Sequence, residues 1–136
     1  MTAAEERTDV ASKLGFTHGQ VVLEIGCADD VDEGLRAGIV AITGKDLVDE
    51  DHDDVGDAVL LWFRDEDGDL TDALCNALTS SAEDGVIWVL TPKTGRAGHV
   101  EPSDISEAAT TAGLTQARTV SAAVDWSGTR LIAPQR

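Results

Sequence analysis

Residues 21–30, Val-Val-Leu-Glu-Ile-Gly-Cys-Ala-Asp-Asp, combine a short apolar run with a glycine turn. In α/β domains that bind nucleotides, the first strand ends in a turn of spacing G-x-G-x-G or G-x-G-x-x-G, whose glycines let the backbone approach the ligand. Here Gly26 holds the first position, whereas Ala28 and Asp30 stand two and four residues further on. Ala28 adds a methyl group, and Asp29 and Asp30 add negative charge where an anion would bind. The segment therefore predicts the fold and argues against a bound cofactor.

The two cysteines, Cys27 and Cys75, are the second group with reactive chemistry. They form no C-x-x-C motif and are too few for a disulfide scaffold. Cys27 lies where a strand passes into a helix, and a helix N-terminus favours the reactive thiolate, although the neighbouring aspartates oppose it. Cys75 is expected to pack beside the apolar face of a helix. Two interpretations stay open: ordinary reduced cysteines, or a redox-responsive Cys27 resolved by Cys75 or by a second molecule.

The loop of residues 92–102 contains the one basic stretch of an acidic protein, residues 92–96, and we expect it to follow a strand. Lys93, Thr94 and Arg96 would then lie at the carboxyl edge of the sheet, where α/β domains bind ligands. Lys93 and Arg96 could bind a phosphate or carboxylate of a partner, or pair with the acidic surface of the chain itself. Trp126, at the tip of a predicted hairpin, is a second candidate contact, with core packing as the alternative.

Other patterns with catalytic or metal-binding potential depart from their motifs. Asp65, Asp67 and Asp69 resemble a calcium loop, but Gly68 comes at the fourth position and Asn76 replaces the terminal glutamate. We expect a turn and a helix cap there instead. The three histidines, His18, His52 and His99, are too far apart in the sequence to form a metal-binding motif. The G-x-S-x-G motif of serine hydrolases does not occur. The sequence therefore predicts no catalytic residue, no cofactor and no metal ligand.

The 136 residues fit one domain, 1–136, and carry a net charge of -16. The charge is uneven, since residues 1–84 hold 22 acids and 5 bases while residues 85–136 hold 4 acids and 5 bases. This balance disfavours direct binding to nucleic acids and to anionic membranes, and leaves a basic protein partner or high solubility open. No apolar run reaches the roughly 20 residues of a membrane span, and no secretory signal is visible. We expect a cytoplasmic protein.

Hydrophobic periodicity predicts strands that alternate with helices. The expected helices cover residues 2–14, 30–43, 69–78 and 103–112, with Asp30, Asp69 and Ser103 as N-caps and Gly44 and Gly113 at the ends. The expected strands cover residues 20–25, 45–48, 58–63, 85–91, 114–124 and 129–133, the last two joined as a hairpin. This order predicts a single-domain, three-layer, Rossmann-like α/β fold, with a mostly parallel sheet and a C-terminal antiparallel hairpin.

The order of these elements resembles the methyltransferases that use S-adenosylmethionine, whose first motif is V-L-D-x-G-x-G-x-G. The chain is short for that fold, because only about ten residues separate the second strand from Ala58, so one βα unit is expected to be missing. In a working member of this class, Gly26, Ala28 and an acid after the second strand (Asp49 or Glu50) would contact the cofactor.

A second resemblance covers nearly the whole chain. Its blocks are residues 13–22 (KLGFTHGQVV), 47–55 (LVDEDHDDV), 85–96 (GVIWVLTPKTGR) and 125–131 (DWSGTRL). Together they resemble the family called domain of unknown function 3052, whose members are small, mostly actinobacterial proteins without an assigned catalytic activity. The resemblance implies a cytoplasmic housekeeping or stress-linked regulatory role and carries over no catalytic residue.

These observations favour a non-enzymatic regulatory module that binds a protein partner on a degenerate methyltransferase-like fold. A thiol response at Cys27 and Cys75, a link to oxidative stress and a partner from the transcription or stress machinery belong to this hypothesis. The alternative is a methyltransferase that uses S-adenosylmethionine, or another enzyme with a small ligand.

Overall fold

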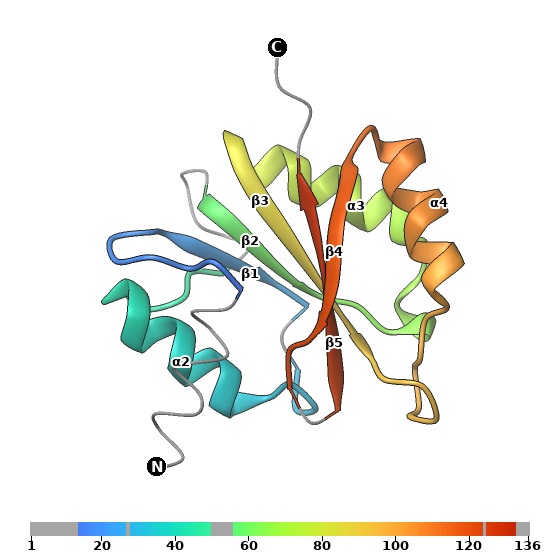
Figure 1. The fold of residues 1–136 in the computed structure, drawn as a ribbon, viewed down its shortest axis with the longest axis horizontal. Coiled ribbons are helices and arrows are strands. Elements are labelled where there is room, and N and C mark those ends of the chain that lie inside the picture. Colours follow the sequence, from blue (N-terminus) through green and yellow to red (C-terminus); the bar gives the residue numbers. More distant parts are fainter. Residues whose placement is uncertain (1–13, 27, 50–55, 124, 133–136) are drawn as a thin grey trace.

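A five-stranded mixed sheet forms the centre of the computed structural model (Figure 1), which describes residues 14–26, 28–49, 56–123 and 125–132. Its strands are β1 (Val22–Ile25), β2 (Gly56–Trp62), β3 (Ser81–Pro92), β4 (Thr115–Ser121) and β5 (Trp126–Ile132). The helices of this part of the chain are α2 (Glu33–Thr43), α3 (Leu70–Ser80) and α4 (Pro102–Ala112), with a short 3₁₀ helix η1 (Asp65–Asp67). The helix predicted for residues 2–14 lies almost wholly outside the described residues.

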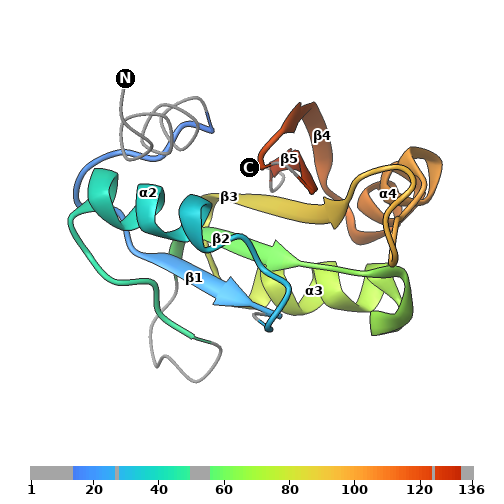
Figure 2. The ribbon, with the colours of Figure 1, turned by 90° about the horizontal axis from the view of Figure 1, so that it is seen from below.

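The strand order is β1-β2-β3-β5-β4. β1, β2 and β3 are parallel, whereas β5 runs antiparallel to both β3 and β4. Figure 2 shows α2 and α3 on opposite faces of the sheet, which makes three layers. The predicted fold class, a Rossmann-like α/β domain with a mostly parallel first part and a C-terminal antiparallel hairpin, is confirmed.

The edge of the sheet beside β1 shows the expected shortening. The strand predicted for residues 45–48 is reduced to one parallel bridge, between Val48 and Leu23. Val48 accepts a backbone hydrogen bond from Glu24 at 2.7 Å and donates one to Val22 at 3.0 Å. Residues 50–55, the centre of the acidic segment, lie outside the described residues. The chain next enters the sheet as β2, on the other side of β1.

Three predicted boundaries are corrected by the structure. Asp32, not Asp30, caps α2, because its carboxylate accepts a hydrogen bond from the Leu35 amide at 2.8 Å. α4 begins at Pro102 rather than after Ser103, since a proline without an amide hydrogen is well suited to the first helical position. In the hairpin, β4 ends at Ser121 rather than at residue 124, and β5 begins at Trp126 rather than at residue 129.

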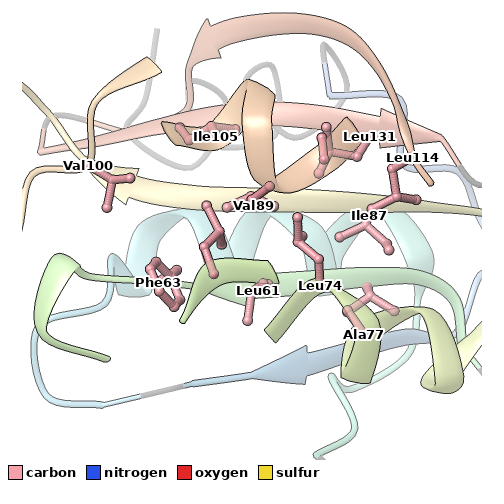
Figure 3. Close-up of a cluster of buried hydrophobic side chains, with 14 of the residues drawn as sticks. Leu61, Phe63, Leu74, Ala77, Ile87, Val89, Val100, Ile105, Leu114 and Leu131 are labelled. Atoms are coloured by element: carbon pink, nitrogen blue, oxygen red, sulfur yellow. The ribbon is translucent and has the colours of Figure 1, made fainter. Parts of the chain in front are cut away.

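Each face of the sheet has its own hydrophobic core. α3 and α4 pack on one face, over a cluster that includes Leu61, Leu74, Val89, Ile105 and Leu131 (Figure 3). α2 packs on the other face, over a cluster that contains all three tryptophans: Trp62, Trp88 and Trp126. Burial on both faces explains why residues 58–63 and 85–91 form nearly continuous apolar runs rather than alternating patterns.

Leu74 tests the placement of α3, because this side chain is 0% exposed within the core under that helix. Leu74→Ala should lower the free energy of unfolding by about 3 kcal/mol through lost burial and a residual cavity. Urea denaturation followed by tryptophan fluorescence measures the difference. The control is Asn76→Ala on the exposed side of the same helix, expected to change stability by less than about 0.5 kcal/mol. Similar losses in both variants would contradict this packing.

Candidate functional site

The strand order reverses between β1 and β2. After β1 the chain passes through α2 to Val48 at one edge, whereas β2 lies on the opposite side of β1 and leads on to β3. Open α/β sheets bind their ligands at such a point, in the crevice outside the carboxyl ends of the strands. The candidate site of this protein is therefore the region around Gly26, after β1, and Arg64, after β2.

The side chain of Arg64 bridges the two strand ends. One terminal nitrogen, Nη1, donates hydrogen bonds to the Gly26 carbonyl at 2.8 Å and to the Trp62 carbonyl at 3.2 Å. Only 7% of the arginine side chain is exposed. The guanidinium therefore crosses the point at which a cofactor would approach the glycine turn.

Asp30 is the main counter-ion of Arg64. The arginine Nε donates to Asp30 Oδ2 at 2.9 Å, and Nη2 donates to the other carboxylate oxygen, so the pair is bidentate. Such a fork-to-fork arrangement is stronger and more directional than a single contact. Asp67 adds a second carboxylate, 3.3 Å from Nη1, and also accepts a hydrogen bond from the Arg64 amide at 2.9 Å.

Trp126 covers this ion pair from the C-terminal hairpin. The Arg64 guanidinium carbon lies 5.2 Å from the centre of the indole ring, within the range of a cation–π contact. The indole nitrogen donates to the Asp30 carbonyl at 3.2 Å, and the ring meets Trp62 edge-on, with centroids 4.9 Å apart. Gly98 also lies against the arginine, where an added Cβ would stand 3.0 Å from Arg64 Cβ.

A second buried ionic group lies beneath the same turn. Glu24 in β1 is 6% exposed and accepts hydrogen bonds from Arg36 Nε at 2.7 Å, Arg36 Nη2 at 2.9 Å and the Trp62 indole nitrogen at 2.8 Å. These bonds compensate for the burial of the carboxylate. They also connect α2 with the tryptophan on which Trp126 packs. The carboxylates of Glu24 and Asp30 thus both make structural contacts.

The pKa of Asp30 is lowered, first by its hydrogen bonds from Arg64 and then by the positive charge of that arginine, which together outweigh desolvation. The pKa of Arg64 is raised, chiefly by the hydrogen bonds to Asp30, with a contribution from Asp67. Both groups are charged at neutral pH. Asp30 is therefore held as an ionised partner and is poorly suited to accept or release a proton in catalysis.

Gly26 adopts a φ of +80°, and a Cβ built there would stand 2.4 Å from the Trp62 carbonyl oxygen. The close approach of β1 to β2 thus requires glycine without any reference to a ligand. Ala28 is exposed, as is Asp49, the acid that would contact a ribose in the enzyme alternative. Glu50 lies outside the described residues.

Of the two cysteines, Cys27 lies outside the described residues. Cys75 is exposed on α3, so the expectation that it packs against the core is wrong. The apolar face of α3 is formed by Leu74 and Ala77, and Cys75 follows directly after Leu74, which turns its side chain away from the sheet.

The basic loop makes contacts within the chain. The Lys93 amine donates to the Ser121 hydroxyl at 2.6 Å, and Arg96 forms an ion pair with Asp125. Thr94 is exposed. Trp126 is 3% exposed, which agrees with the core-packing alternative rather than with an exposed partner contact, and its ring lies over Arg64.

The aspartates that resemble a calcium loop serve the turn and the helix. Asp67 binds Arg64 as described, and Asp69 accepts hydrogen bonds from the amides of Thr71 at 2.8 Å and Asp72 at 3.4 Å, at the start of α3.

Among the described residues, no three acidic, histidine or cysteine side chains gather closely enough to hold a metal ion. In the same part of the chain, no helix has the length and apolar character needed to cross a bilayer.

The sequence interpretation missed Arg64 and the pairing role of Asp30. One signal was present: Arg64 directly follows the most apolar strand, at the edge where ligands bind, and is the only base between residues 46 and 92. A lone base at that position indicates either a ligand contact or an internal ion pair. Its partner, 34 residues earlier, could not be identified from local spacing.

The fold and the strand-end geometry resemble those of Rossmann-like domains of methyltransferase type. The chain belongs to the family described as "Protein of unknown function (DUF3052)", whose model matches residues 11–135. Uncharacterized proteins of Mycobacterium tuberculosis and Mycobacterium bovis are each 49% identical to it over 135 residues, which cover 99% of this chain and 85% of theirs.

Solved methyltransferases share the fold at low sequence identity. The magnesium protoporphyrin IX methyltransferase of Synechocystis, with bound S-adenosylmethionine, is 12% identical, with a TM-score of 0.60 over 96% of this chain and 78% of that one. A methyltransferase from Aquifex aeolicus gives 12% and 0.59, over 95% and 90%. An O-methyltransferase of neocarzinostatin biosynthesis gives 14% and 0.67, over 93% and 53%. At these identities the likeness establishes the fold alone.

The Arg64–Asp30 pair predicts how stability depends on pH. Because the folded-state pKa of Asp30 lies below its ordinary value of 3.8, the contribution of the pair is complete above that value and disappears as the pH falls through the folded-state pKa. Asp30→Asn should lower the free energy of unfolding by about 1 kcal/mol at neutral pH, because the Asp30 side chain is 54% exposed and solvent screens the pair. The difference from the wild type should shrink on acidification, as measured by denaturant titrations at decreasing pH.

The matched control is Asp29→Asn, which removes the same formal charge from the exposed neighbouring residue. This variant should change the free energy of unfolding by less than about 0.5 kcal/mol at neutral and at acidic pH. If the two variants behave alike, or if the loss in Asp30→Asn is independent of pH, the bidentate pair does not stabilise the fold as described.

Proposed function

We propose that this protein is a non-enzymatic regulatory module that binds another protein, on a methyltransferase-like fold whose cofactor crevice is closed from within. The observation that carries the proposal is the buried Arg64 side chain, which bridges the carbonyls of Gly26 and Trp62. A cofactor that approached this turn would have to displace the guanidinium from its carboxylate. Arg64 is 7% exposed, so its separation from Asp30, which is 54% exposed, would leave a buried positive charge with less compensation, and this is unfavourable.

The start of α2 supports the same conclusion. In a cofactor-binding domain, the free amides and the positive end of the helix dipole attract an anionic group. Here Asp32 caps the helix, and Glu33 adds a second negative charge in its first turn. Both would repel the carboxylate of S-adenosylmethionine.

A groove between α3 and α4 suggests the chemistry of the partner. It has a volume of about 300 Å³ and is lined by apolar Phe63, Leu70, Val100 and Ala108 together with Asp65, Asp69, Asp104 and Glu107. A lysine or arginine of a partner could place its aliphatic stem on the apolar floor and its charge among the carboxylates. The net charge of -16 would in addition accelerate association with a basic protein.

The proposal also covers the localisation of the protein, its partner and its regulation. We place the module in the cytoplasm, with a partner from the transcription or stress machinery and a response to thiol oxidation. The exposure of Cys75 on α3, the helix that borders the groove, supports such a response. In this proposal, Cys27 is the second thiol of the oxidation response.

The alternative function is a methyltransferase that uses S-adenosylmethionine. The retained Gly26 and Glu24, at the positions of the glycine and acid of the methyltransferase motif, favour it, as does the similarity to solved methyltransferases. Both residues, however, have structural contacts that account for their identity: the approach of Trp62 to Gly26 and the bonds of Arg36 to Glu24.

Calorimetric titration with S-adenosylmethionine separates the two functions. The wild-type protein should show no binding tighter than about 1 mM, which corresponds to roughly 4 kcal/mol. Arg64→Ala, with circular dichroism as a check on folding, should also fail to bind tightly because Asp30 and Asp32 still oppose the cofactor carboxylate. A micromolar dissociation constant for the wild type would contradict the closed crevice and favour the enzyme.

The groove is tested with a fluorescent peptide of alternating lysine and leucine, in anisotropy titrations at low salt. Binding should weaken at least about tenfold in the double variant Asp104→Lys and Glu107→Lys, because the carboxylates that face the cation are reversed. The matched control reverses Asp29 and Asp49, which are exposed outside this groove. Equal weakening in both would indicate general attraction to an acidic protein rather than a docking groove. The same titration after mild peroxide, with Cys75→Ser alongside, tests the thiol response.

A further inference from the structure

A second cavity lies on the α4 side of the sheet, at the carboxyl end of β3, and shares Val100 with the lining of the acidic groove. Its volume is about 100 Å³. Four hydroxyl side chains from three neighbouring strands line it, and the sheet register brings them together: Thr91 is opposite Ser127, and Thr119 is opposite Thr129. An otherwise apolar sheet face thus ends in a hydroxyl array.

The wall that faces this array is largely apolar. Val100, Pro102 and Ile105 contribute to it, from the segment before α4 and from the first turns of that helix. His99 stands beside them, with its ring Nδ1 2.9 Å from the Pro92 carbonyl. Since a carbonyl only accepts, Nδ1 carries the hydrogen, and Nε2 lies 3.9 Å from the Glu101 carboxylate. The cavity is therefore hydroxylated on one side and apolar on the other.

Two threonine hydroxyls in the cavity have free hydrogen-bonding capacity. Thr91 is 2% exposed, and its hydroxyl makes no hydrogen bond to the described residues; this oxygen is not among their buried atoms without a partner, so it is accessible at the cavity surface. Thr129, 1% exposed, has only a long contact of 3.3 Å with the Thr119 hydroxyl. A hydroxyl at a cavity surface can bond to water or to a ligand. For Thr91 the cavity is the direction from which a partner can come.

The charge and size of the cavity restrict the ligand. Its lining contains no aspartate, glutamate, lysine or arginine, and transfer of an uncompensated ion to such a site is unfavourable. A volume of about 100 Å³ equals roughly three water molecules at about 30 Å³ each. We propose that this cavity binds a small uncharged molecule with at least two hydroxyl groups, which bond to the hydroxyls of Thr91 and Thr129 while its carbon atoms contact Val100 and Ile105.

Propane-1,2-diol is a suitable probe, and lactate is its charged counterpart of similar size. In two-dimensional amide NMR titrations, the diol should give saturable shifts at Thr91, Thr119, Ser127 and Thr129, with a dissociation constant in the millimolar range. Lactate should give none at these residues, because its carboxylate would lack a counter-ion in the cavity. This test does not depend on the proposed protein partner or on the closed crevice.

Thr91→Val keeps the shape of the side chain and removes its hydroxyl, and should weaken diol binding at least fivefold. Thr91→Ser keeps the hydroxyl and should retain binding, while Thr111→Val, exposed on α4 outside the cavity lining, serves as the control for folding. Shifts that do not saturate, that spread over the surface or that persist in Thr91→Val would overturn the proposal and indicate a cavity that holds only water. Equal binding of lactate would overturn its restriction to uncharged ligands.

Discussion

The charge of one buried arginine determines how the C-terminal hairpin, the glycine turn and the end of β2 fit together. Arg64 is 7% exposed on its side chain and contacts the Gly26 carbonyl, the Asp30 carboxylate and the face of Trp126. A guanidinium keeps its charge under all physiological conditions, so these partners cannot be relinquished by a change of protonation. Removing the Asp30 carboxylate would leave the buried charge less well compensated. In the proposed closed crevice, the ion pair and the ring of Trp126 occupy the approach to the glycine turn.

The repeating features of the fold could be predicted from the sequence. Burial on both faces of a parallel sheet produces apolar runs, and these located β2 and β3 because no tertiary contact is needed to recognise them. Gly44 and Gly113 mark helix ends because their φ values of 76° and 83° are unfavourable for other residues. The missing βα unit also followed from chain length alone, and the structure reduces the predicted second strand to the Val48 bridge.

The candidate site could not be predicted in the same way, because its interactions join residues far apart in the sequence. Arg64 and Asp30 are separated by 34 residues, and Trp126 and Asp30 by 96. Aspartate is a residue type that commonly caps helices. In the structure the Asp30 carboxylate binds Arg64, and Asp32 caps α2 instead. Cys75 and Trp126 illustrate the same difficulty: each lies at a boundary between apolar and polar surroundings, where a shift of one residue along a helix or strand exchanges burial for exposure.

The retained parts of the nucleotide-binding motif have a structural explanation that does not need a ligand. Gly26 remains glycine because a Cβ would stand 2.4 Å from the Trp62 carbonyl oxygen. Glu24 remains acidic because Arg36 and the Trp62 indole donate to it inside the protein. Both constraints arise from the packing of β1 against β2 and α2, and they persist whether or not a cofactor binds. The chain departs from the motif at Ala28 and Asp30, where a cofactor-binding domain has glycines that approach the ligand, and Asp30 instead pairs with Arg64.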